Sequence, residues 1–134
     1  MSFDLTKSAL DQLVGKRVVR IEMDADKTHI IFITHCCKIA YEACTQCCDE
    51  SWFNHLSGVN VLIGNLVSGV EEIQKVEHPP TRQYVDWVYG YRITTPKGVA
   101  TLELRNSSNG FYDGSVRVCN PSEIKVSLPV TEDF

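Results

Sequence analysis

The sequence lacks the long apolar stretch that a membrane helix requires. Its longest apolar run, residues 59–67, is interrupted by Asn60, Gly64 and Asn65, and it is far shorter than the roughly 20 residues that span a bilayer. The first thirteen residues contain Asp4 and no continuous hydrophobic block, so they do not resemble a secretory signal. These absences predict a protein that has no membrane partner and acts in the cytoplasm.

An excess of positive charge is also missing, as are the common catalytic motifs. Thirteen Lys and Arg residues face seventeen Asp and Glu residues, for a net charge of −4. Because no basic stripe is present to neutralise a phosphate backbone, we expect no nucleic-acid polymer as a partner. The sequence has no P-loop, no Rossmann glycine fingerprint, no Gly-x-Ser-x-Gly and no His-Glu-x-x-His. We therefore predict a binding protein rather than an enzyme.

The 134 residues, 43% of them hydrophobic, are enough to bury one core, and we predict a single compact domain over residues 1–134. Apolar residues at helical spacing predict a short helix over residues 5–13, closed by Gly15. Alternating residues, with Val19, Ile21 and Met23 on one face, then predict a hairpin that extends into a three-stranded meander ending at residue 42.

A second short helix is predicted over residues 49–58, because Asp49 or Ser51 can cap it and Trp52, His55 and Leu56 share one face. Strands are predicted over residues 66–76, 87–94, 99–105 and 116–119, with a loop at Pro79-Pro80. The sum predicts an α+β fold, a mainly antiparallel six- or seven-stranded sheet with two short helices.

Two blocks of the sequence resemble a known family. The run CCDESWFNHLSGVNVLIGNLVSGVEEI and the later run VYGYRITTPKGVATLELRNSSNGFYDG are similar to small single-domain proteins of unknown function from tailed phages and prophages. Members usually have Gly-Asp where this chain has Thr45-Gln46, and a glycine-containing turn where it has His35-Cys36-Cys37. The resemblance implies a viral protein acting in the host cytoplasm, and it implies no particular chemistry.

Six cysteines, at positions 36, 37, 44, 47, 48 and 119, raise the question of a zinc site through Cys44-x-x-Cys47. If Cys36-Cys37 lies at a hairpin tip, Cys44 is about 23 Å away at about 3.3 Å per residue. One tetrahedral ion cannot reach both groups, so we predict no metal and no cofactor. Cys47 and Cys48 read best as small buried hydrophobic residues. The alternative is a nucleophile at Cys48 with His55 as its base.

The segment from Arg105 to Gly114 concentrates hydrogen-bonding side chains and glycines directly after a predicted strand. Its amides and hydroxyls can bond a small polar ligand, its arginine can grip an anion, and an aromatic ring can stack on a base. A plain turn stabilised by local hydrogen bonds is the other interpretation. The predicted ligand-binding residues, including two further arginines nearby, are Arg82, Arg92, Arg105, Asn106, Ser107, Ser108, Asn109, Phe111 and Tyr112.

These features favour a small non-enzymatic phage-type protein that binds and sequesters a host immune signalling nucleotide, such as a cyclic or ADP-ribose-derived one. Such a protein would counter host defence, and burial of the ligand favours a homo-oligomer. Two alternatives remain from the sequence: a protein–protein inhibitor of a host defence effector, and a cysteine-dependent enzyme.

Overall fold

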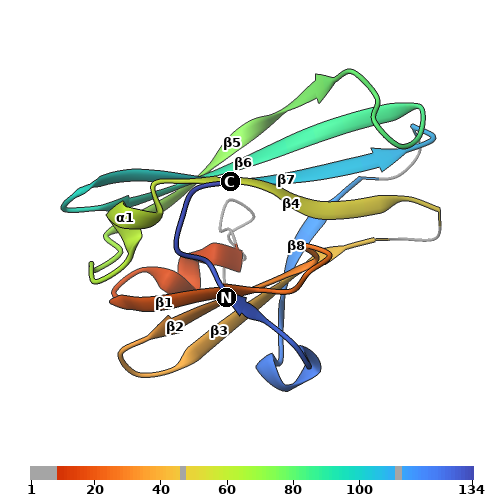
Figure 1. Ribbon diagram of the computed structural model, residues 1–134. Coiled ribbons are helices and arrows are strands. Elements are labelled where there is room, and N and C mark those ends of the chain that lie inside the picture. Colours follow the sequence, from red (N-terminus) through yellow and green to blue (C-terminus); the bar gives the residue numbers. More distant parts are fainter. Residues whose placement is uncertain (1–8, 46–47, 111–112) are drawn as a thin grey trace, which may run out of the picture.

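The structure, a computed structural model, describes residues 9–45, 48–110 and 113–134. Its strands form two sheets, one of five strands in the order β8-β3-β2-β1-β9 and one of four in the order β4-β7-β6-β5. Figure 1 shows the two sheets facing each other as layers. The strands are β1 (Val18–Met23), β2 (His29–Thr34), β3 (Lys38–Cys44), β4 (Glu50–Ser57), β5 (Gly69–His78), β6 (Val85–Thr95), β7 (Gly98–Ser108), β8 (Ser115–Cys119) and β9 (Leu128–Pro129).

The predicted α+β class is therefore wrong. Within the described ranges, helix is limited to α1 (Val59–Leu62) and two 3₁₀ turns, η1 (Ala9–Leu13) and η2 (Pro121–Glu123). None of these helices is long and apolar enough to cross a membrane. Of the predicted N-terminal helix, the part up to residue 8 lies outside the described residues.

The predicted second helix, residues 49–58, is instead the strand β4. Its residues pair antiparallel with β7 from Glu50 to Ser57, and the register shifts between Phe53 and His55. Phe53 is completely buried in the core cluster between the sheets, and Trp52 alternates with it toward the opposite face. A strand fits because pairing satisfies the backbone groups while adjacent aromatic residues bury on both faces.

The predicted meander of β1, β2 and β3 is confirmed, with antiparallel pairing throughout. Asp24 sets the first turn, because its Oδ1 accepts hydrogen bonds from the backbone N–H groups of Thr28 and His29. A register shift between Val18 and Arg20 buries Val18 and leaves Val19 52% exposed. The expectation that Val19 shares a face with Ile21 and Met23 is wrong, since the bulge reverses its side.

The core lies between the sheets and includes Leu10 and Leu13 of η1. From the five-stranded sheet, Phe32 and Tyr41 meet edge to face at 5.9 Å between ring centroids. From the four-stranded sheet, Tyr91 and Ile93 enter the same cluster, as the alternation of β6 predicts.

The C-terminal segment ties the two sheets together. β9 pairs with β1, and Phe134 then exchanges two backbone hydrogen bonds with Leu56 of β4. The carboxylate of Asp133 accepts the N–H groups of Gly58 and Val59, and these bonds lower the pKa of Asp133. In Figure 1 this segment rises from the five-stranded sheet to the four-stranded one.

Candidate functional site

The predicted ligand loop is shorter than the sequence suggests. Asn106, Ser107 and Ser108 belong to β7 and are fully buried, so their assignment to an open binding loop is wrong. The Asn106 amide donates to Asp49 Oδ2 at 2.7 Å and to Ser51 Oγ at 2.9 Å. Asp49 and Ser51 thus satisfy the donor group of Asn106 inside the protein, while Asn106 Oδ1 is buried with no hydrogen-bond partner among the described residues.

The turn that follows β7 contains Asn109 and Gly110, and Gly110 has the left-handed φ of 103° that favours glycine. Its N–H donates to Ser108 Oγ at 3.0 Å, which is the local turn chemistry considered from the sequence. Phe111 and Tyr112 lie outside the described residues.

Arg105 is committed to a buried ion pair. Its Nε donates to Asp86 Oδ2 at 2.7 Å, and its Nη2 donates to the carbonyl of Pro79 at 3.0 Å. The side chains of Arg105 and Asp86 are 14% and 0% exposed. Burial raises the pKa of Asp86, but hydrogen bonds from Ser107, Thr81 and Arg105 outweigh it and lower this pKa to about 2. A phosphate could recruit Arg105 only by leaving a buried carboxylate unpaired.

Arg92 lies on the outer face of β6 and pairs with Glu71 of β5 at 3.2 Å, both side chains being largely exposed. In the register of β6 and β7, Arg92 is opposite Thr101. Arg105 is four residues farther along β7, about 13 Å away at about 3.3 Å per residue. The structure therefore does not bring Arg92 and Arg105 to one ligand.

Arg82 has a different environment. The loop of residues 79–84 folds back over the outer face of the four-stranded sheet, held by hydrogen bonds from Thr81 to Asp86 and from Gln83 N–H to Ser107. This places the Arg82 guanidinium 3.8 Å from the centre of the Trp52 ring. Its carboxylate partner is Glu50, at 3.3 Å, with both side chains about half exposed.

Arg82 and Trp52 form one wall of a polar cleft of about 560 Å³ between the β1–β2 turn, β4 and the 79–84 loop. The volume falls in the range of about 300–1,000 Å³ that small-ligand sites occupy. The residues that line this polar cleft are Ala25, Asp26, Lys27, Thr28, Ser51, Trp52, Asn54 and Arg82.

The turn that carries Lys27 is fixed against β4. The Lys27 carbonyl accepts the N–H of Phe53 at 2.7 Å, and Lys27 has a φ of 61°. A residue other than glycine rarely adopts this left-handed conformation, which costs about 1–2 kcal/mol. Lys27 lines the polar cleft, and its ammonium lies 4.8 Å from the centre of the Phe134 ring. Lys27 is not among the binding residues predicted from the sequence, because nothing in the sequence shows that this turn packs against β4.

The cysteine arrangement considered from the sequence does not form. His55 lies inside β4, five residues beyond Glu50, which is about 16 Å at about 3.3 Å per residue. Cys48 precedes that strand, so His55 cannot act as its base. Cys36 and Cys37 lie at the β2–β3 tip, at the opposite end of β3 from Cys44, as the zinc argument assumed.

One group in the described part of the chain has the side chains of a metal site. His29, Glu42 and Cys119 offer ligand atoms that all lie within 4.8 Å of one another. They come from β2, β3 and β8, which explains why sequence spacing did not bring them together.

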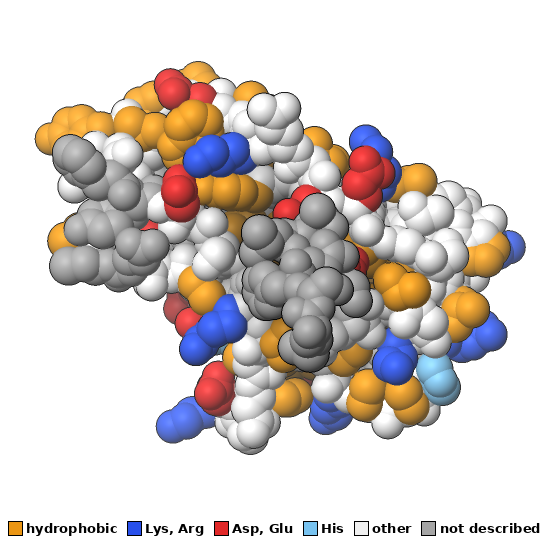
Figure 2. Space-filling view, turned by 180° about the vertical axis from the view of Figure 1, so that it is seen from behind, with side chains coloured by type: hydrophobic (Ala, Val, Ile, Leu, Met, Phe, Trp, Pro, Cys, Tyr) orange, Lys and Arg blue, Asp and Glu red, His pale blue; other side chains and the backbone are white. Residues whose placement is uncertain are grey.

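The face shown in Figure 2 has Lys and Arg side chains scattered among acidic and apolar ones, with no single basic patch.

Comparison with known proteins finds one family model and a viral relative. Residues 11–118 match the family model described as "Domain of unknown function (DUF7448)". An uncharacterized protein of Acanthamoeba polyphaga mimivirus is 31% identical over 99 residues, which cover 71% of each chain. The search of solved structures finds no match.

Proposed function

The chain belongs to the DUF7448 family of domains of unknown function and has a viral relative; on this premise, we propose that it is a viral protein that binds and sequesters a small signalling nucleotide of its host. The ligand is held in the polar cleft, and capture without turnover counters host defence. The setting we propose is the host cytoplasm during phage infection, with a second copy of the chain closing the cleft in a homo-oligomer.

The observation that carries the proposal is that Arg82, on the cleft wall, has only a half-exposed ion pair that a ligand can replace. Its ion pair with Glu50 is half exposed, and exposed pairs of this kind contribute only about 0–1 kcal/mol. A phosphate group therefore displaces Glu50 at little cost and gains a bidentate, charge-assisted contact. The buried pairing of Arg105 rules out the same exchange there.

The rest of the cleft supplies the other contacts that a nucleotide needs. Asn54 on the cleft wall offers an amide group for ribose or base edges. Lys27 also lines the cleft, with its ammonium 4.8 Å from the centre of the Phe134 ring. The Arg82 guanidinium lies over the Trp52 ring, 3.8 Å from its centre, and a planar cation of this kind can also stack against a base. This site keeps Arg82 from the sequence prediction and replaces the other residues.

The test is binding of cyclic di-AMP, cyclic AMP and ADP-ribose by isothermal titration calorimetry, followed by heating and chromatography of the released ligand. We expect one of these probes to bind and to be released intact, with an affinity loss of at least tenfold in Arg82→Ala. Arg92→Ala is the matched control, because its ion pair with Glu71 is similarly exposed but lies outside the cleft. Equal losses in the two variants, or a cleaved product, contradict the proposal.

A second candidate function, inhibition of a host protein through direct contact, is favoured by a separate observation. An apolar groove of about 360 Å³ lies where β1, α1 and β9 meet, and the exposed Val19 is on its wall. Val19→Lys would abolish capture of a host effector and leave nucleotide binding intact. If Val19→Lys instead retains effector capture while Arg82→Ala loses it, the groove is not the contact surface.

A further inference from the structure

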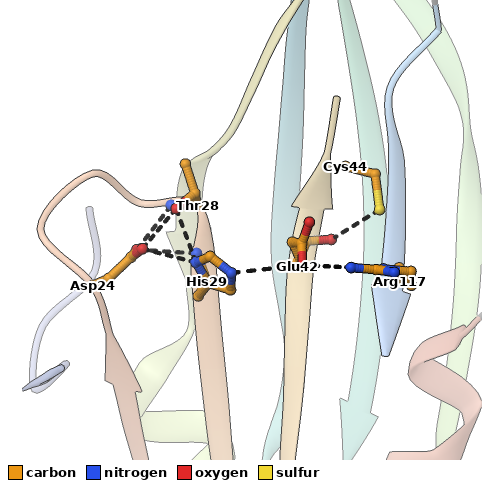
Figure 3. Close-up of polar contacts among 6 residues, drawn as sticks. All are labelled: Asp24, Thr28, His29, Glu42, Cys44 and Arg117. Carbon is orange, nitrogen blue, oxygen red and sulfur yellow. Dashed lines mark hydrogen bonds and ion pairs between the residues drawn. The ribbon is translucent and has the colours of Figure 1, made fainter. Parts of the chain in front are cut away.

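The outer face of the five-stranded sheet carries a row of polar side chains that runs across its strands. His29 of β2 pairs in register with Glu42 of β3, and Glu42 pairs with Arg117 of β8. Figure 3 shows Asp24, His29, Glu42 and Arg117 in line across the sheet. This face is opposite the core. The row adjoins the polar cleft at Thr28, which lines the cleft and donates to Asp24.

The imidazole of His29 is oriented by a carboxylate. Asp24 Oδ2 lies 2.9 Å from His29 Nδ1 and also accepts the Thr28 hydroxyl at 2.6 Å. The other ring nitrogen, Nε2, points toward Glu42, with 3.7 Å to its Oε2. A carboxylate on one nitrogen of a histidine whose other nitrogen faces further ligands is the usual outer shell of a metal-binding histidine.

Cys119 completes the group. It is opposite Ala40 in the pairing of β3 with β8, two residues along β3 from Glu42, so both side chains lie on the outer face. One ligand atom from each of His29, Glu42 and Cys119 lies within 4.8 Å of the others, and all three residues are partly buried.

We propose that His29, Glu42 and Cys119 bind one divalent transition-metal ion of the zinc class. Imidazole nitrogen, carboxylate oxygen and thiolate sulfur form a mixed donor set that suits Zn²⁺ and excludes Ca²⁺ or Mg²⁺ as the preferred ion. Asp24 is a positioning residue that fixes the tautomer and orientation of His29. Three protein ligands leave a fourth position for water or a small ligand.

The three ligand atoms need to move only slightly closer together to hold a zinc ion. Ligand atoms about 2.0–2.3 Å from a tetrahedral zinc ion are about 3.3–3.8 Å apart. The separation of His29 Nε2 and Glu42 Oε2 already meets this, and side-chain rotation brings Cys119 the remaining distance. Arg117, 2.8 Å from Glu42 Oε2 and largely exposed, moves away from that oxygen at little cost. Binding displaces the Cys119 thiol proton to solvent.

The ion would fix the end of β8 at Cys119, where the chain leaves the five-stranded sheet. β8 and β9 are opposite edges of the five-stranded sheet, so residues 120–127 run across it from the end of β8, and Figure 1 shows this segment below the sheet. Ser127 anchors its far side by donating to Glu22 Oε1 at 2.6 Å. A metal bound to Cys119 would fix the other end of this segment, where it leaves β8.

The experiment is titration of the purified full chain with Co²⁺ and Zn²⁺, followed by absorption spectroscopy and thermal unfolding. We expect one equivalent of Co²⁺ to produce a thiolate-to-cobalt charge-transfer band, and Zn²⁺ to raise the melting temperature. Cys119→Ser should lose the band and at least tenfold in Co²⁺ affinity. His29→Gln should lose a similar factor in affinity, and it keeps the proposal testable if Cys119→Ser fails to fold.

Two control variants separate this site from the other thiols. Cys44→Ser removes a thiol from the same strand as Glu42 but outside the proposed ligand set, and it should retain the band. The exposed pair Cys36 and Cys37, with sulfurs 3.6 Å apart, is the competing place for a soft metal. Loss of the band in Cys36→Ser/Cys37→Ser, with a normal band in Cys119→Ser, overturns the proposal, as does the absence of any thiolate band in the wild type.

Discussion

Replacing Arg105 and replacing Arg92, both in the four-stranded sheet, should lower the free energy of unfolding by different amounts. Replacing Arg105 by methionine keeps most of the side-chain volume but leaves Asp86, which is fully buried, without its charged partner. Removing one partner of a buried pair costs about 3–5 kcal/mol, because the remaining charge is uncompensated. Arg92→Met breaks a pair whose side chains are 46% and 68% exposed, so it should cost less than about 1 kcal/mol.

Urea unfolding measures both costs. With a slope of about 2 kcal/mol per molar, a loss of about 3 kcal/mol moves the midpoint of Arg105→Met down by about 1.5 M. Arg92→Met should move it by less than about 0.5 M. The double variant Arg105→Met/Asp86→Asn should recover part of the loss, since no full charge is then buried. Equal midpoint shifts for the two single variants would refute the reasoning that Arg105 is structural.

Two further predictions concern stability. The pKa of Asp86 is about 2 in the folded protein, against an ordinary value of 3.8. Its ionised form therefore contributes about 2 kcal/mol to the free energy of unfolding, a contribution that is complete above about pH 4 and lost as the pH falls toward 2. Asp86→Asn should lack this loss of stability in acid, and identical pH dependence of stability in the two proteins would disprove the prediction. Gly114→Ala should destabilise by about 1–3 kcal/mol, because an added Cβ meets the Cβ of Asn106 at 2.8 Å. Gly69→Ala, with nothing within 4 Å, should leave the denaturation midpoint nearly unchanged.

Local patterns predicted most strands but not their assembly into two sheets. Alternation of apolar and polar residues correctly identified β1 to β3, β6 and β8 as strands, because a strand alternates its faces between neighbouring residues. Alternation does not show which strands pair across long separations in the sequence. β4 pairs with β7, whose residues are more than forty positions away, and only this pairing decides that residues 49–58 form a strand. Without it, the same residues fit a helix equally well.

The candidate sites failed to emerge from sequence for the same reason. Asn106 looked like a loop residue because its partners Asp49 and Ser51 are more than fifty positions away. Arg105 looked available because its carboxylate, Asp86, belongs to the neighbouring strand. A polar side chain counts as a binding group only when its internal partners are known, and those come from the fold.

The most direct test of the proposed function is the fluorescence of Trp52 during ligand titration. The chain has two tryptophans, so the Trp87→Phe variant isolates the ring on which Arg82 lies at 3.8 Å. Addition of ADP-ribose or a cyclic nucleotide should change this fluorescence saturably as the guanidinium moves to the phosphate, and Arg82→Ala should abolish the change. A flat titration with every nucleotide, or an undiminished change without Arg82, would contradict ligand capture in the polar cleft.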